Sequence, residues 1–445
     1  MVLCTYMTSS LYSDYLKLLK QAVSIKSIST DKSFSADITK MSKWCETTMK
    51  GMGFKTKTFK DYGNPIVFGH LVVDASLPTV LHYGHYDVQP ADKSEGWDTD
   101  PFKVKENPKT LVGRGVVDNK GQFLIYLSAI SSLIKEKKLK YNVKFILEGD
   151  EETGSGRMKD FIAANKDLVT ADFALISDGE QLNDQPTIDV SYRGSMNATV
   201  TIYGSISELH SGLYGGLVQN PINVLSSLVY KLANEYGDTL LFKKGVSVVS
   251  ERDEKKMSEN TYNRDLFTKI TGFKPRFKYN NEMFNYLGFE STIQITGITG
   301  GYTGEGYKNA IPKQASVKVN VRYNPDLEPE KVAAEFTKYI KQNFLAGAKF
   351  DIKIDDNSAG VSLDTSKEVF ERISVLLQRT YEKPVMYNYC GATLPIASDI
   401  KKELGIPTVF VGLANEDCNM HGANENLNIS IAKKGLEFVS EFLSK

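Results

Sequence analysis

Residues 121–152 read GQFLIYLSAISSLIKEKKLKYNVKFILEGDEE, and this stretch decides the fold class. Its first half, to about residue 136, carries apolar side chains at helical spacing and predicts a helix. The apolar run at residues 142–147 has the length of a buried strand and ends directly in acidic residues. A helix followed by a short, continuously apolar strand is typical of a parallel sheet that is covered on both faces by helices.

The same alternation continues on both sides of this stretch. Helical spacing predicts further helices at residues 11–23, 38–50, 366–381 and 430–443. Short apolar runs predict further strands at residues 65–73, 79–83, 173–176 and 408–411. Strands that alternate with helices in this way predict an α/β fold with a doubly wound, mostly parallel sheet.

A different order of elements occupies residues 189–361. The predicted order is a strand at 195–203, a helix at 221–236, strands at 292–298 and 315–322, a helix at 329–343 and a strand at 349–354. This βαββαβ order is the ferredoxin-like unit. The polar segment SERDEKKMSENTYNRD, residues 250–265, is expected to form one exposed extra helix. We therefore predict an α/β domain of residues 1–188 and 362–445, interrupted by an α+β domain of residues 189–361.

Composition excludes several classes of function. The 445 residues contain 54 Lys and Arg against 54 Asp and Glu, so there is no overall basic field to attract nucleic acid or anionic lipid. No apolar run reaches the roughly 18 residues that a membrane span needs, and the N-terminus lacks the pattern of a secretory signal. Four scattered cysteines, Cys4, Cys45, Cys390 and Cys418, do not form a disulfide framework. These features predict a cytoplasmic protein without nucleic-acid or membrane partners.

A histidine and an acid lie close together at residues 82–87, HYGHYD. In a strand, His85 and Asp87 project to the same side and His82 to the other, so His82 is expected in the core. A metal-binding imidazole usually donates its second ring N–H to a carboxylate or a carbonyl. Taken alone, the pattern fits a structural histidine as well as a ligand.

Other acids also stand where a strand ends or a helix begins. Residues 113–121, GRGVVDNKG, place Asp118 before a helix, with a spacing that matches neither common phosphate-binding loop. The acids of EGDEE, residues 148–152, repel one another, which a cation would relieve and a surface turn would tolerate. Asp178 follows the strand at 173–176, and His421 follows the strand at 408–411.

The shared position of these residues is more informative than any one of them. Open α/β sheets bind ligands beyond the carboxyl ends of their strands. Two imidazoles and three carboxylates form a mixed nitrogen and oxygen ligand set that suits zinc and related divalent ions. The members of this set are His85, Asp118, Glu152, Asp178 and His421.

The motifs HYDVQP, GRGVVDNKG, EGDEETGS, ISDG and ELHSGLYGG, with the late His421, together resemble the co-catalytic dizinc metallopeptidases, which include aminoacylases, carboxypeptidases and carnosinase-type dipeptidases. DVQP and LHSGLYGG are similar to the cytosolic non-specific dipeptidase branch. The resemblance implies a catalytic domain at residues 1–188 and 362–445 and a lid and dimerisation domain at residues 189–361. It also implies a homodimer that hydrolyses dipeptides or short peptides through a hydroxide bridging two metal ions.

Roles at the metal centre follow from the same resemblance. One zinc ion would be bound by His85 and Asp178, the other by Glu152 and His421, with Asp118 bridging both. Manganese or cobalt would suit the same ligands.

The family resemblance also assigns the residues around the metals. Asp87 would orient His85, and Glu151 would be the general base. The family further implies a cis peptide bond after Asp118.

Four residues of the inserted domain and its neighbourhood would contact substrate. His210 would reach the active site of a partner subunit and stabilise the oxyanion, and Arg322 would bind the terminal carboxylate of the substrate. Asn309 and Thr393 would line the same substrate pocket, although relatives often carry threonine and serine at these two positions.

Three alternatives remain open at this point. An N-acyl amino acid amidohydrolase or deacetylase would use the same centre. A catalytically inactive binding or assembly protein would keep the fold, although the intact Glu151 argues against it. A phosphoesterase is disfavoured because no phosphate-binding loop is recognised.

Overall fold

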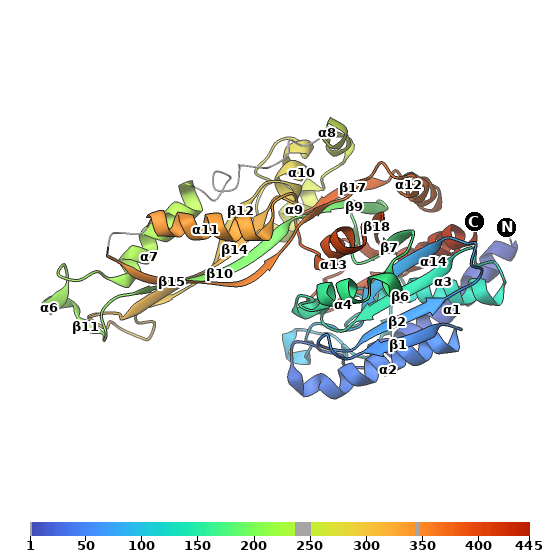
Figure 1. Ribbon diagram of the computed structural model, residues 1–445, viewed down its shortest axis with the longest axis horizontal. Coiled ribbons are helices and arrows are strands. Elements are labelled where there is room, and N and C mark those ends of the chain that lie inside the picture. The colour runs from blue at the N-terminus through green and yellow to red at the C-terminus, as the bar shows by residue number, and fades with distance from the viewer. Residues whose placement is uncertain (1, 236–250, 344–346) are drawn as a thin grey trace. The chain divides into compact units, whose positions relative to one another are not determined.

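The computed structural model describes residues 2–235, 251–343 and 347–445 (Figure 1). The chain forms two compact units. The first unit contains residues 1–190, 363–388 and 396–445, and the second contains residues 191–362 and 389–395.

A nine-stranded sheet is the centre of the first unit. Its order is β1-β2-β6-β3-β7-β18-β9-β16, and β17 also pairs with β9. The strands β6, β3, β7 and β18 run parallel, which confirms the predicted parallel sheet, whereas both edges are antiparallel. The bounds are β1 Lys55–Phe59, β2 Ile66–Leu71, β3 Thr79–His85, β6 Asn142–Glu148, β7 Phe173–Ile176, β9 Thr187–Tyr192, β16 Val361–Ser362, β17 Met386–Cys390 and β18 Thr408–Gly412.

Helices pack on this sheet and on one another. The helix α3 contacts β3 as well as α1 and α14, and it is buried on almost every side from Lys120 to Ile130. Burial on all sides explains why its sequence is apolar around its whole circumference rather than along one stripe. The bounds are α1 Val2–Val23, α2 Ser35–Gly51, α3 Lys120–Lys135, α4 Met158–Ala164, α5 Lys166–Val169, α12 Glu368–Tyr381, α13 Pro395–Asp399 and α14 Ile429–Ser444.

The second unit has a four-stranded antiparallel sheet in the order β12-β14-β10-β15. Alternate residues of β10 and β14 are buried against the helices α7 and α11, as the period of two in a strand requires. The observed order of elements, β10-α7-β12-β14-α11-β15, is the predicted ferredoxin-like order. The bounds are β10 Gly194–Tyr203, α7 Pro221–Tyr230, β12 Thr292–Gly300, β14 Gln314–Tyr323, α11 Pro329–Asn343 and β15 Lys349–Ser358.

The polar insertion differs from the prediction. The extra helix expected at residues 250–265 is present but shorter, as α8 Glu251–Glu259, and the described part of the insertion contains two more helices, α9 Arg264–Thr271 and α10 Asn280–Gly288. Met257 of α8 is buried, as are Met283 and Phe284 of α10, and these two helices pack together. The apolar partners of the charged segment therefore come from residues that follow it in the sequence. The helix predicted to end at residue 236 ends at Tyr230 and continues as a π turn to Glu235, and residue 236 lies outside the described chain.

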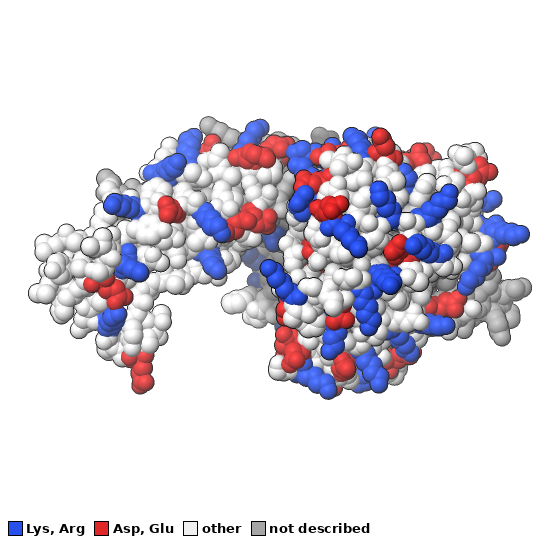
Figure 2. Space-filling view, turned by 60° about the horizontal axis from the view of Figure 1, so that its bottom comes forward, with Lys and Arg blue, Asp and Glu red and all other residues white. Residues whose placement is uncertain are grey.

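The distribution of charge on the surface and the character of the helices both match what the composition indicates. On the face shown in Figure 2, basic and acidic side chains are interspersed rather than separated into large patches of one sign. Among the described residues, no helix combines the length and the apolar character that crossing a membrane requires.

Candidate metal centre

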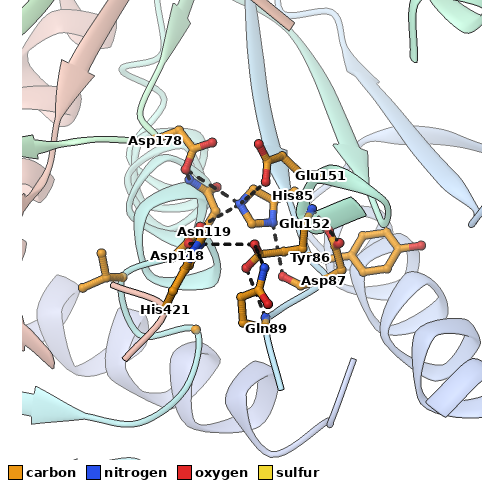
Figure 3. A network of polar contacts seen from close by, with 12 residues as sticks. His85, Tyr86, Asp87, Gln89, Asp118, Asn119, Glu151, Glu152, Asp178 and His421 are labelled. Carbon is orange, nitrogen blue, oxygen red and sulfur yellow. Dashed lines mark hydrogen bonds and ion pairs between the residues drawn. The ribbon is translucent and has the colours of Figure 1, made fainter. Parts of the chain in front are cut away.

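The five predicted ligands all belong to the first unit and come together beyond the carboxyl ends of the central strands of its sheet (Figure 3). His85 is the last residue of β3, Asp178 follows β7, and Glu152 lies in the single helical turn Glu151–Thr153 after β6. Asp118 lies just before α3, and His421 follows β19, Ala414–Asn415. The strands β6, β3 and β7 are parallel neighbours, so their carboxyl ends bring these segments to the same place.

The ligand atoms form two groups that share Asp118. In the first group, His85 Nε2 lies 2.8 Å from Asp118 Oδ1 and 3.7 Å from Asp178 Oδ1. In the second group, His421 Nε2 lies 2.8 Å from Asp118 Oδ2 and 3.2 Å from Glu152 Oε2. Within each group the candidate ligand atoms all lie within 4.8 Å of one another. The two carboxylate oxygens of Asp118 therefore face different groups, as bridging requires.

Asp87 is fully buried and touches both groups through its two oxygens. Nδ1 of His85 hydrogen-bonds the backbone carbonyl of Asp87 at 3.2 Å and lies 3.3 Å from Oδ1 of its carboxylate, whose Oδ2 accepts the backbone N–H of Glu152 at 3.1 Å. Nε2 of His85 faces Asp118 at the same time. The backbone carbonyl and the carboxylate of Asp87 are therefore placed to keep the proton of His85 on Nδ1.

Two further side chains hold ligands and were not predicted. The backbone and side-chain N–H groups of Gln89 donate to the two carboxylate oxygens of Glu152, at 3.1 and 2.7 Å. Asn119 donates its amide N–H to Asp178 Oδ1 at 2.7 Å. Gln89 lies in the motif HYDVQP and Asn119 in GRGVVDNKG. Their closeness in sequence to His85 and Asp118 was the only signal that could have identified them. The peptide bond between Asp118 and Asn119 is cis, as the resemblance implied.

Glu151 stands beside the two groups without belonging to either. Its carboxylate lies 4.0 Å from His85 Nε2, and its side chain is 20% exposed. Burial raises the pKa of Glu151 well above its usual value. His85 opposes this shift, while the nearby carboxylates of Asp178 and Asp118 add to it. A carboxyl group with a raised pKa is suited to accept a proton near neutral pH.

The cluster has an excess of negative charge. The contacts with Asp118 and Glu152 raise the pKa of His421 to about 10. Burial alone would lower the pKa of His85, but Asp178 and Asp118 outweigh burial and raise it well above its usual value. Without a metal ion, each imidazole is therefore protonated on both ring nitrogens, and its positive charge takes the place of a cation among the carboxylates. A divalent ion in each group, bound by one imidazole nitrogen and two carboxylates with Asp118 shared, would supply that positive charge, so the donor set fits such ions.

His210 and Asn309 lie side by side in the second unit. His210 belongs to the short strand β11, Leu209–His210, which pairs with β13, Ala310–Ile311. Both side chains are exposed, and Nδ1 of His210 accepts the backbone N–H of Gly212 at 3.0 Å.

Arg322 and Thr393 also contact each other in the second unit. Arg322 Nη1 donates to Thr393 Oγ1 at 2.7 Å, and Thr393 Oγ1 donates to the carbonyl of Arg193 at 2.7 Å. Arg322 lies at one end of β14, and β13 leads into its other end at Gln314. Arg322 is eight positions along the strand from Gln314, which corresponds to roughly 25 Å. Within one chain, His210 and Asn309 are therefore not brought together with Arg322 and Thr393.

His82 and Cys418, to which the sequence assigned no function, are a core histidine and a free thiol as expected. His82 is fully buried, its Nδ1 lies 2.7 Å from the carbonyl oxygen of Leu175, and burial lowers its pKa to about 4. It is a core residue, as strand parity predicted. Cys418 is a free thiol, and its Sγ donates to the carboxylate of Glu180 at 3.1 Å.

Comparison with known proteins decides the family. The family model described as "Peptidase family M20/M25/M40" matches residues 81–445, which include every candidate ligand. This chain belongs to the M20/M25/M40 peptidase family. The match confirms the resemblance that the motifs indicated.

Relatives in this family resemble the chain over most of its length. The Cys-Gly metallodipeptidase DUG1 of Candida albicans is 26% identical over 460 residues, which cover 96% of this chain and 94% of the relative. The Beta-Ala-His dipeptidase of Mus musculus is 29% identical over 375 residues, covering 82% of this chain and 76% of the relative.

Solved structures of the family share the fold. The M20 family metallo-carboxypeptidase Sso-CP2 from Sulfolobus solfataricus superposes with a TM-score of 0.88 at 27% identity and covers 97% of this chain and 98% of its own. Human carnosine dipeptidase 1 superposes with a TM-score of 0.83 at 25% identity, covering 99% and 97% of the two chains.

Proposed function

We propose that this M20/M25/M40 peptidase hydrolyses dipeptides or short peptides with two divalent zinc ions, for which manganese or cobalt are the alternatives. The observation that carries the proposal is the pair of ligand groups that share Asp118, with Glu151 beside them. The relatives described above are named as dipeptidases, which supports this substrate class. Their names do not favour the N-acyl amino acid amidohydrolase or a non-catalytic protein.

Each ligand has a defined place in the proposal. His85 and Asp178 would hold one ion, Glu152 and His421 the other, and Asp118 would bind both. When bound, a pair of divalent ions supplies Lewis acidity that polarises the scissile carbonyl and makes hydroxide available near neutral pH.

Glu151 is the proposed general base. Its carboxylate takes the proton of the attacking water and passes it to the amine that leaves, so no net proton is gained or lost by the residue. The raised pKa supports this role because the carboxyl group holds the proton between the two transfers. Asp87 keeps His85 in the tautomer that presents Nε2 to the ion.

Arg322 is the proposed site for the terminal carboxylate of the substrate. A guanidinium group can form two parallel hydrogen bonds to a carboxylate. Thr393 accepts one N–H of Arg322 and so holds the guanidinium in place.

We also propose a homodimer in which His210 and Asn309 complete the active site of the partner. His210 lies roughly 25 Å or more from Arg322 along the sheet, a span longer than a dipeptide, so the two contact one substrate only if they come from different copies. Exposed apolar side chains near His210, namely Ile206, Leu213, Leu217 and Tyr307, would gain from burial against a second copy.

A cytoplasmic location is part of the same proposal. Among the described residues, Cys45, Cys390 and Cys418 are not joined in disulfides, which supports it because disulfides are rare in a reducing compartment.

The substitution Glu151→Gln tests the function directly. The amide cannot accept the proton, so kcat for a dipeptide should fall about 10²- to 10⁴-fold while the metal content stays at two ions per chain. A matched control is Glu136→Gln, which removes a carboxylate that pairs with Lys138 at the surface. Unchanged turnover in Glu151→Gln would contradict the assignment of the base.

A substrate panel tests the substrate class. Dipeptides with a free terminal carboxylate should be hydrolysed faster than their C-terminal amides and faster than N-acetyl amino acids. Preference for the N-acetyl amino acids would support the amidohydrolase instead.

A further inference from the structure

A buried ion pair outside the ligand set joins two segments that are far apart in the sequence. Arg114 is 1% exposed and Glu425 is 0% exposed, and Arg114 Nη1 lies 2.8 Å from Glu425 Oε2. Two short strands, β5 Thr110–Val112 and β20 Asn426–Asn428, pair next to them and bring the segments together. These segments lead directly to Asp118 on one side and come directly from His421 on the other.

Glu425 holds the loop that carries Asp118. Its carboxylate accepts backbone N–H groups from Gly115 at 3.0 Å, Val117 at 2.8 Å and Asp118 itself at 3.2 Å. A buried carboxylate that accepts several backbone N–H groups fixes the path of the loop, because each unpaired group would cost free energy.

Arg114 holds the loop that carries His421. Its Nη2 donates to the carbonyls of His421 at 3.1 Å and Gly422 at 3.3 Å. The same nitrogen donates to the carbonyl of Pro90 at 3.2 Å, next to Gln89, which holds Glu152. One guanidinium therefore contacts the segments around two ligands.

The loop at His421 needs such support. His421 has a φ of 61° and Asn419 a φ of 54°, in the left-handed region that residues other than glycine rarely adopt. A residue in this region is strained, and it keeps this conformation only where the surrounding contacts determine it. The two carbonyls that Arg114 binds belong to His421 and to the residue after it.

We propose that Arg114 and Glu425 are a positioning pair for the second cation group, formed by Asp118, Glu152 and His421. The inference rests on the proposed metal-dependent function. The hydrogen bonds of Arg114 run to the segments of His421 and Glu152, which belong to this group alone, and those of Glu425 run to the loop of Asp118, which both groups share. A buried ion pair is a weak source of stability compared with apolar packing, so its role here is better explained by the geometry that it imposes.

The test uses the full-length protein and the variants Arg114→Lys and Glu425→Gln. Lysine keeps the charge but cannot reach Glu425 and the carbonyls at the same time, and glutamine keeps the shape but carries no charge. The matched control is Leu377→Ala, which removes packing in the buried face of α12 without touching the metal centre. Metal content is measured by mass spectrometry after dialysis against zinc buffered over a series of concentrations.

Positioning predicts a selective effect. Arg114→Lys should bind one zinc ion with the affinity of the wild type and the second about 10- to 100-fold more weakly, the range found for residues that orient metal ligands. Glu425→Gln loosens the loop of Asp118, which both groups share, and also frees Arg114, so it should weaken both ions and the second more than the first. Excess zinc should restore kcat with little change in KM. Leu377→Ala should unfold at a lower temperature and still bind both ions normally.

Two results would overturn the inference, namely wild-type affinity for both ions in the variants, or an equal loss of both ions in Arg114→Lys. Failure of the proposed function has a different signature, because the wild-type protein itself would then not bind two ions. The inference and the function on which it rests are therefore tested separately.

Discussion

Replacing Asp87 with Asn probes the first cation group. The carboxylate of Asp87 is fully buried, with Oδ1 3.3 Å from His85 Nδ1 and Oδ2 accepting the N–H of Glu152. In Asp87→Asn the amide oxygen can still accept the N–H of Glu152, so the amide NH₂ group faces His85. An N–H donor facing Nδ1 favours the tautomer that carries its proton on Nε2, which blocks the nitrogen that faces Asp118 and Asp178.

The size of the effect follows from the lost contact. To bind the ion, His85 must carry its proton on Nδ1. In the variant this tautomer lacks the interaction with the charged carboxylate, which is worth about 1.5–3 kcal/mol. At about 1.4 kcal/mol for each factor of ten, the first ion should bind roughly 10- to 100-fold more weakly. The backbone carbonyl of Asp87 also lies 3.2 Å from His85 Nδ1 and remains in the variant, which limits the loss.

The assay is competitive zinc titration against a chelating indicator, with Asp92→Asn as a control for the same substitution at an exposed helix cap. Asp87→Asn should weaken one ion and leave the second unchanged, since Asp118, Glu152 and His421 are intact. Wild-type affinity for both ions, or selective loss of the second ion, would refute the reasoning about His85.

Three other predictions concern substrate, pH and assembly. Arg322→Gln should raise KM for dipeptides about 10- to 100-fold without changing metal content, because the hydrogen bonds to a charged carboxylate are lost; an unchanged KM in steady-state kinetics would contradict this. In metal-free protein the pKa of His421 is raised from 6.5 to about 10, so its stabilising contribution is complete below pH 6.5 and is lost as pH rises toward 10. Thermal unfolding of the metal-free protein should therefore show a fall in Tm over this range that is smaller in His421→Gln, and equal slopes would argue against it. Ile206→Asp places a charge on the exposed apolar surface near His210 and should convert dimers to monomers in sedimentation experiments; monomeric wild-type protein would contradict the proposed dimer.

The centre of the fold was predictable because its strands are short and apolar and are separated by helical segments. The antiparallel edge was not. β2 is mostly buried, like the parallel strands, but it pairs antiparallel with both β1 and β6. An apolar run indicates burial and does not encode strand direction.

The candidate ligands were predictable for a related reason. His85, Glu152 and Asp178 each follow a strand, and parallel strands bring their carboxyl ends together. The residues that hold the ligands were not found in this way. Arg114 and Glu425 are 311 residues apart, and their contact depends on the pairing of β5 with β20, strands of three residues each that have no periodicity to detect.

The arrangement of the four substrate residues shows a further limit. The resemblance placed Asn309 and Arg322 in one pocket, but a single chain keeps them near opposite ends of β14. The resemblance assigned only His210 to a partner subunit, and the pairing of β11 with β13, which places Asn309 beside His210, is a contact that the sequence does not indicate.

The most direct test is a crystal structure of the protein saturated with zinc, with anomalous data collected at the zinc absorption edge. Two peaks should lie on either side of Asp118, one among His85, Asp118 and Asp178 and the other among Asp118, Glu152 and His421. No peak at either group, or zinc bound only at other residues, would contradict the dinuclear centre.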